Sequence, residues 1–143
     1  MKQLLIIIIL GAWSFAAEAQ TMDPSAVVIA NGIGESTMSE KELRSVMRGE
    51  GDSFWDNNTP VTVVLHATTN TDCAKSAQFL VNIARPSTLQ RHWLSLVFQG
   101  RARPPIFQND DALIINFVRN TPGAIAIVYS GQVPAELQVA IER

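Results

Sequence analysis

The chain has 143 residues, a formal net charge of −2 and a single cysteine, Cys73. Without a basic excess nothing draws it onto nucleic acid or acidic lipid, so neither is an expected partner. One thiol cannot close an internal disulfide. Cys73 therefore stays free or pairs with another chain, and a free, partly buried thiol is the favoured state.

The first 19 residues have the form of a secretory signal peptide. Lys2 supplies the positive start, residues 4–10 are an unbroken apolar run, and residues 17–19 carry the small-x-small pattern that signal peptidase cleaves. A retained anchor is the alternative, but the apolar run is shorter than the roughly 20 residues that span a bilayer. We expect cleavage after Ala19, a periplasmic or secreted protein, and no membrane insertion after cleavage.

Removing residues 1–19 leaves 124 residues, 20–143, which is the length of one ordinary domain. The first element expected in this domain is a buried strand at residues 26–30, a β-branched apolar run. The turn-prone residues Asn31, Gly32 and Gly34 end it.

A helix is predicted to begin at Ser39. Ser39 and Glu42 fit a capping box, and Met38 and Leu43 occupy the two positions of a hydrophobic staple. The amphipathic pattern stops near Gly49, so the helix is expected to end there.

A polar loop at residues 49–60 leads to a second strand at residues 61–65. The loop contains two aromatic residues, Phe54 and Trp55, and Trp55 either caps the core or faces a partner. The strand is apolar along its length, which is typical of a parallel strand covered on both faces.

Two helices are predicted next. The first spans about residues 73–84, with a buried stripe at Phe79, Leu80 and Ile83. Pro86 interrupts the chain, and the second helix opens at Ser87, with Gln90 in the capping-box position. It stops at Gly100. Its apolar side chains are assigned to the core and comprise Leu89, Trp93, Leu96, Val97 and Phe98.

In the last third of the chain, helix and strand patterns again follow one another. Residues 104–105 are two prolines that force an extended link, and residues 110–111 are two aspartates that favour the start of a helix. That helix ends near Pro122, a third strand follows at 124–128, and the tail from Pro134 is expected to form a short helix. Strands separated by helices imply βα units, so we expect one α/β domain with a mostly parallel sheet.

The order of these motifs resembles that of a known family. Residues 39–49 read S-x-x-E-L-x-x-V-M-x-G, residues 93–105 read W-x-x-L-V-F-x-G-R-x-R-P-P, and residues 120–129 read N-x-P-G-A-I-A-I-V-Y. Over residues 26–130 the chain is similar to the second lobe of phosphate-type periplasmic solute-binding proteins. It is most similar to small exported single-lobe relatives of phosphate ABC transporter substrate-binding proteins. The resemblance implies a single lobe of the type 2 periplasmic-binding-protein-like fold.

In that family an oxyanion is bound by hydroxyls and backbone amides of the loop between a strand and the helix that follows it. In this chain the corresponding loop follows the strand at residues 61–65. The resemblance therefore implies an oxyanion such as phosphate at Thr68, Thr69, Asn70 and Thr71, where a helix N-terminus adds unpaired N–H groups. The chain lacks the family's Ser-Gly-Thr run and following arginine, and Asp72 either repels an anion or caps the helix. A solvated turn is the structural alternative for the same four residues.

Three further residues complete the candidate binding set. Asn31 and the glycines after the first strand are expected at the same end of the sheet as the threonine loop, unless they form a plain turn. Arg101 and Arg103 are the best cations for an anionic ligand, because guanidinium groups match oxyanion geometry. The alternative is a solvated loop in which these arginines pair with carboxylates.

Metal binding and catalysis are not expected. His66 and His92 are separated by a whole helix and belong to no spaced His/Cys/carboxylate cluster, so neither a metal site nor a cofactor is predicted. No nucleophile elbow, P-loop or His-Glu helical motif is present. The preferred function is an exported module that binds a small oxyanion. The alternative is an envelope interaction or sensory accessory domain that has lost ligand binding and uses Trp55, Arg101 and Arg103 as contacts.

Overall fold

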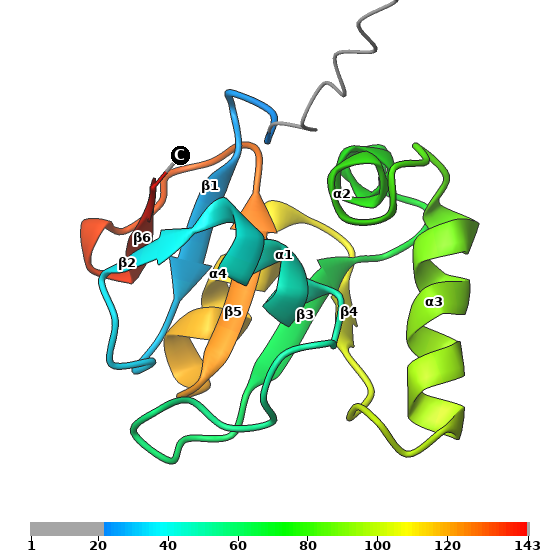
Figure 1. Ribbon diagram of the computed structural model, residues 1–143. Helices are drawn as coiled ribbons and strands as arrows, with labels where there is room; N and C mark the ends of the chain where they lie inside the picture. The colour runs from blue at the N-terminus through cyan, green and yellow to red at the C-terminus, as the bar shows by residue number, and fades with distance from the viewer. Residues whose placement is uncertain (1–21, 143) are drawn as a thin grey trace, which may run out of the picture.

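The computed structural model describes residues 22–142, so the predicted signal peptide and its cleavage site lie outside the described residues. Helices and strands follow one another along the chain (Figure 1), in the order β1 Val27–Ala30, β2 Thr37–Ser39, α1 Glu40–Met47, β3 Thr62–His66, α2 Asp72–Val81, α3 Pro86–Phe98, β4 Ile106–Gln108, α4 Asp111–Asn120, β5 Ala124–Val128, a 3-10 turn Ala135–Leu137, and β6 Gln138–Glu142. No helix within residues 22–142 is long and apolar enough to cross a bilayer.

The strands form one six-stranded sheet in the order β2-β6-β1-β5-β3-β4. Strand β3 runs parallel to both of its neighbours, β4 and β5, and β2 runs parallel to β6. Strand β1 is antiparallel to β5 and β6. The predicted fold class, an α/β lobe with a small sheet flanked by helices, is confirmed, and the direction of β1 is the departure from parallel order.

Helices cover both faces of the sheet, and alternate residues of each strand point to opposite faces. In β5, Ile125 and Ile127 join the core under α1, α2 and α3, while Ala124, Ala126 and Val128 pack on the side of α4. Burial on both faces explains why β5 and the middle of β3, residues 63–65, are apolar.

The two helix starts that the sequence predicts from serines have different outcomes. Ser39 is the N-cap of α1, and its Oγ accepts the Glu42 N–H at 3.1 Å, so this prediction is confirmed. The predicted start at Ser87 is wrong, because α3 already begins at Pro86, with Arg85 as an N-cap that makes no side-chain hydrogen bond. The fixed φ of proline suits the first helical position, so Pro86 opens the helix it was expected to precede.

Replacing each serine by alanine tests this difference. Ser39→Ala should lower the free energy of unfolding by about 1 kcal/mol, because it leaves an amide at the start of α1 without its acceptor. The control Ser87→Ala should change stability by less than about 0.5 kcal/mol, since Ser87 is exposed and caps nothing. Urea denaturation followed by circular dichroism gives both values, and equal losses would contradict the assignment.

Two residues expected in the core are exposed. Ile83 is 48% exposed because α2 stops at Val81 and Asn82 takes the left-handed conformation, with φ of 60°. Phe98 is 85% exposed in the last turn of α3. The tail also differs, since the helix expected from Pro134 is one 3-10 turn followed by β6.

Trp55 lies in the core and does not face a partner. Its side chain is 7% exposed, and its Nε1–H donates to the Gly123 carbonyl oxygen at 2.9 Å. This bond ties the 49–60 loop to the start of β5. The alternative in which Trp55 caps the core is therefore the observed one.

Candidate functional site

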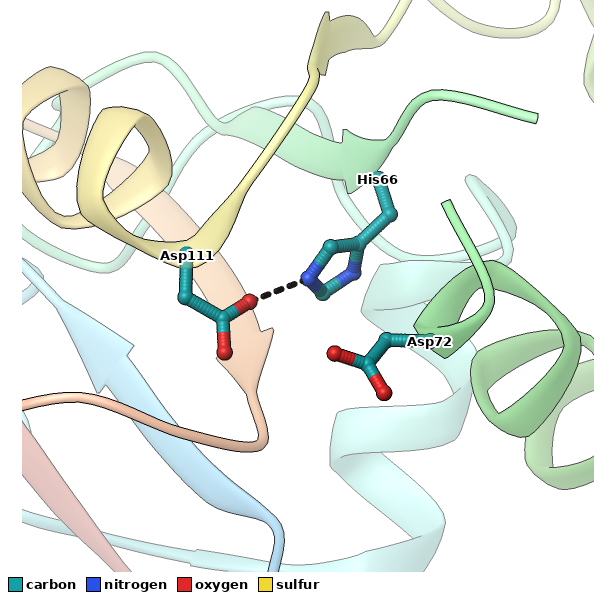
Figure 2. Close-up of side chains that lie close together, drawn as sticks. All are labelled: His66, Asp72 and Asp111. Carbon is teal, nitrogen blue, oxygen red and sulfur yellow. Dashed lines mark hydrogen bonds and ion pairs between the residues drawn. The ribbon is translucent and has the colours of Figure 1, made fainter. Parts of the chain in front are cut away.

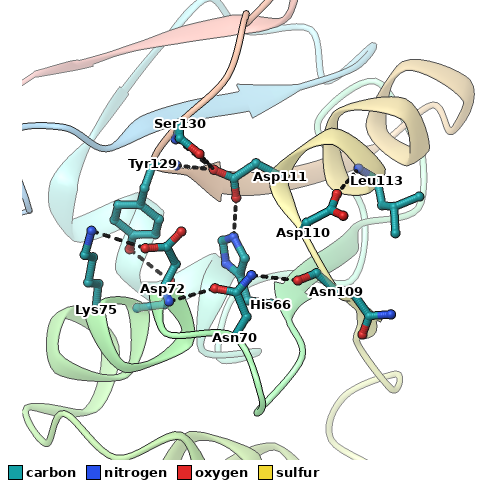
Figure 3. A network of polar contacts seen from close by, with 11 residues as sticks. His66, Asn70, Asp72, Lys75, Asn109, Asp110, Asp111, Leu113, Tyr129 and Ser130 are labelled. Carbon is teal, nitrogen blue, oxygen red and sulfur yellow. Dashed lines mark hydrogen bonds and ion pairs between the residues drawn. The ribbon is translucent and has the colours of Figure 1, made fainter.

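A polar network lies where β3 and β5 end and where α2 and α4 begin (Figures 2 and 3). His66 is the last residue of β3, Asp72 the first of α2 and Asp111 the first of α4. The side chains of His66 and Asp111 are buried, and one ligand atom from each of the three residues lies within 4.8 Å of the others. This is the end of a parallel sheet at which open α/β folds bind ligands.

Asp111 is the centre of the network. One carboxylate oxygen is hydrogen-bonded to His66 Nε2. The other accepts the Tyr129 N–H at 3.0 Å, the Ser130 N–H at 2.7 Å and the Ser130 hydroxyl at 2.9 Å. Burial alone would raise the pKa of Asp111, but these hydrogen bonds outweigh it and hold that pKa below its usual value.

Tyr129 closes the inner side of the network. Its hydroxyl shares a 2.9 Å hydrogen bond with Ser76 Oγ, and its ring centroid lies 5.8 Å from that of His66. Burial raises the pKa of Tyr129 to about 12, so the hydroxyl keeps its proton at neutral pH. Lys75 Nζ lies 5.1 Å from the Tyr129 ring centroid and pairs with Asp72 at 3.2 Å.

The threonine loop borders this network on the solvent side. Thr68, Thr69 and Thr71 are exposed, and within residues 22–142 their hydroxyls make no hydrogen bond. Asn70 Oδ1 accepts the Asp72 N–H at 2.8 Å, and Asn70 Nδ2 donates to the Asn109 carbonyl at 2.6 Å. The amide of Asn70 therefore holds the loop in shape, while the three hydroxyls are available to a ligand.

Asn31 does not lie with the threonine loop, and the expectation that it does is wrong. Because β1 is antiparallel to β5, Asn31 lies at the beginning of β5, where its N–H donates to the Ala124 carbonyl at 3.1 Å. Its side-chain Nδ2 donates to the Val118 and Arg119 carbonyls, each at 3.0 Å. Asn31 thus binds the C-terminal end of α4.

Arg101 and Arg103 line a hollow of about 210 Å³ at the beginning of β3. Thr62 forms part of its wall, and Asp52 is the one carboxylate among its lining residues. The Arg103 guanidinium lies 5.4 Å from the Phe54 ring centroid, which orients it. Within residues 22–142 neither guanidinium has a carboxylate partner, so the predicted alternative of a paired loop is not observed.

The predicted binding residues therefore divide between the two ends of the sheet. Thr68, Thr69, Asn70 and Thr71 lie where β3 ends, while Arg101 and Arg103 lie where it begins. The carboxylates of Asp72, Asp110 and Asp111 all belong to the threonine end. One small ligand cannot contact both groups of residues.

Sequence reasoning did not bring His66, Asp72 and Asp111 together. His66 and Asp111 are 45 residues apart in the chain, and only the parallel packing of β3 beside β4 and β5 brings them together. The sequence does contain a signal for this cluster, since a histidine follows the apolar run of β3 and two aspartates form the N-cap and the first residue of α4. Polar residues at such strand ends and helix starts meet at one end of a parallel sheet.

Cys73 lies beside this network in the first turn of α2. It is buried and free, and burial raises the pKa of its thiol. The thiolate is the reactive form of cysteine, so this position favours the inert, free state over pairing with another chain.

No protein-family model matches the sequence, and no curated protein matches it. Among solved structures, the fold is similar to that of an ABC-type phosphate transport receptor from Vibrio cholerae. The TM-score is 0.53 at 12% sequence identity, and the match covers 82% of this chain and 46% of that chain. This chain therefore spans about half the length of the receptor. At such low identity the likeness shows a shared fold and does not assign a function to this chain.

Proposed function

We propose that this chain is an exported solute-binding module that binds a small oxyanion, phosphate by analogy with the transport receptor of similar fold, and performs no catalysis. The observation that carries the proposal is the pair of unpaired guanidinium groups, Arg101 and Arg103, on one hollow. Guanidinium groups bind oxyanions through paired, charge-assisted hydrogen bonds. An unpaired guanidinium at a hollow offers these bonds without first breaking an ion pair.

Electrostatics favours the arginine end over the threonine end for an anion. At the threonine end the nearby cation, Lys75, already pairs with Asp72, and Asp111 is ionised because its pKa is lowered. Asp110 adds a third carboxylate at this end, so an anion there meets more carboxylates than cations. At the arginine end two cations face one carboxylate, Asp52. The threonine loop remains the second candidate position, because its three hydroxyls and the start of α2 are accessible.

Calorimetric titration with phosphate and with sulfate tests the function and the position together. The double variant Arg101→Ala/Arg103→Ala should weaken binding by about tenfold or more, because each lost charge-assisted hydrogen bond costs about 1.5–3 kcal/mol. The double variant Thr69→Ala/Thr71→Ala should keep the affinity of the wild type. Arg85→Ala/Arg91→Ala is the matched control, since both arginines are exposed and neither lines the hollow.

Each contrary outcome has a definite meaning. If only the threonine variant loses affinity, the ligand lies at the other end of the sheet and the arginine site is wrong. If the control variant loses as much as Arg101→Ala/Arg103→Ala, the effect is general charge and the hollow is not the site. Absence of heat and of any thermal shift at millimolar phosphate and sulfate would contradict oxyanion binding altogether.

One observation favours the alternative, an interaction domain of the cell envelope. Phe98 is 85% exposed and Leu94, one helical turn earlier, is 48% exposed, so the outer face of α3 offers apolar side chains to a partner. These two residues replace the buried Trp55 as the expected contacts. If neither anion binds, this becomes the better supported function.

A further inference from the structure

Three side chains with metal-binding atoms converge from three elements of the fold. His66 comes from the end of β3, Asp72 from the start of α2 and Asp111 from the start of α4 (Figure 2). One nitrogen and two carboxylate oxygens lie within 4.8 Å of one another. We propose that these three residues form a binding site for a divalent transition-metal ion of the zinc type.

The donor set suits this class of ion. Imidazole nitrogen and carboxylate oxygen both bind Zn²⁺, at about 2.0–2.2 Å. Two ligands at tetrahedral angles then lie roughly 3.4 Å apart, which is within the observed spread of the three atoms. His66 Nε2 and Asp111 are directly hydrogen-bonded in the metal-free protein, so these two atoms have to move apart to reach this spacing and admit the ion. Ca²⁺ and Mg²⁺ prefer six or more oxygen ligands and are not expected to compete.

The surroundings hold the ligands in position before an ion arrives. One oxygen of Asp111 accepts three hydrogen bonds from Tyr129 and Ser130, which fixes the carboxylate and leaves its other oxygen directed at His66 (Figure 3). Hydrogen bonds of this outer kind orient the ligands of protein metal sites and raise their affinity. The buried His66–Asp111 pair thus presents a nitrogen and an oxygen at low cost in side-chain entropy.

Asp72 is the most exposed of the three ligands, and its ion pair with Lys75 competes with metal binding. The side chain of Asp72 is 21% exposed, while that of His66 is 1% exposed, so an ion reaches the site from the Asp72 side. In the metal-free state Lys75 neutralises Asp72 at 3.2 Å. Binding therefore replaces this ammonium group at Asp72 and the proton shared by His66 and Asp111. Three protein ligands leave the fourth position of a tetrahedral ion to water.

This proposal does not depend on the proposed oxyanion function. The three ligands lie where β3 ends, whereas Arg101 and Arg103 lie where it begins. Loss of one kind of binding therefore leaves the other intact, and the two experiments have separate variants.

Titration of the EDTA-treated and desalted protein with Zn²⁺ by calorimetry tests the site, with Co²⁺ absorption as a second readout. We expect one ion per chain and the visible bands of tetrahedral Co²⁺. Asp72→Asn should weaken Zn²⁺ binding more than about tenfold, since a lost ligand costs at least as much as a lost outer hydrogen bond. Lys75→Met should strengthen binding, because it removes the competing ammonium group.

The two histidines of the chain form a matched pair of variants. His66→Gln should abolish binding, and His92→Gln should leave it unchanged, since His92 belongs to α3 and contacts Arg48 and Glu50 instead of the three ligands. If His66→Gln does not fold, Asp72→Asn and Lys75→Met still decide the question. Absence of Zn²⁺ binding, binding lost in His92→Gln, or an unchanged affinity in Asp72→Asn would each overturn the proposal.

Discussion

Asp111→Asn should lower the free energy of unfolding by about 3 kcal/mol, because it removes a buried carboxylate that is hydrogen-bonded to His66, Tyr129 and Ser130, and a hydrogen bond to a charged group contributes about 1.5–3 kcal/mol. The substitution keeps the size of the side chain and removes the charge that holds His66. It also weakens the three hydrogen bonds from Tyr129 and Ser130. Urea denaturation in the presence of EDTA gives the value for the metal-free protein.

Asp110→Asn is the matched control for this prediction. Asp110 is the exposed N-cap of α4, and its carboxylate accepts the Leu113 N–H at 2.9 Å. Asparagine caps helices about as well as aspartate, so the free energy of unfolding should change by less than about 0.5 kcal/mol. Equal losses in the two variants would show that helix capping, and not the buried pair, accounts for the effect.

Among the glycines within residues 22–142, Gly123 should cause the largest loss of stability when it is replaced by alanine. Gly123 has φ of +86°, and a Cβ added there would lie 2.1 Å from the Pro60 carbonyl oxygen and 2.8 Å from Thr59 Cγ2. The first contact is with backbone, which cannot move aside as a flexible side chain can. The same glycine carbonyl accepts the Trp55 indole N–H. We expect a loss above about 4 kcal/mol, or an unfolded protein.

Gly100→Ala separates backbone strain from steric overlap. Gly100 also has a positive φ, +69°, but a Cβ added there meets nothing within 4 Å. The cost should be the left-handed conformation alone, about 1–2 kcal/mol. Thermal and urea denaturation of both variants measure the difference. Similar losses would mean that the loop carrying Pro60 moves away from Gly123 without penalty.

The parts of the fold that could be predicted are those with local causes. The apolar runs of β3 and β5 and the serine cap of α1 each depend on a few neighbouring residues. Strands β2 and β4 have three residues each, too few for a hydrophobic period to show. The direction of β1 depends on partners about a hundred residues away in β5, so local pattern does not show that Asn31 lies at the opposite end of the sheet from the threonine loop.

In the candidate site, too, only the features with local causes could be predicted from the sequence. The strand end and helix start that frame the threonine loop follow from local pattern, because a polar run separates two apolar segments. The pairing of His66 with Asp111 does not follow from local pattern. It arises because β4 lies parallel to β3, and this places the start of α4 next to the end of β3. The exposure of Phe98 has a different reason: Leu96 in the same last turn of α3 is buried, while Phe98 lies on the outer face of the helix with Leu94 and is 85% exposed.

The two outermost strands, β2 and β4, have a consequence for behaviour at high concentration. An outermost strand presents unpaired backbone N–H and C=O groups, which another chain can extend into a larger sheet. Here each of these strands is only three residues long, and Pro104 and Pro105, which lack an N–H, come directly before β4. Little backbone is left for a second chain to pair with, so the fold itself resists aggregation by strand addition at both sides of the sheet.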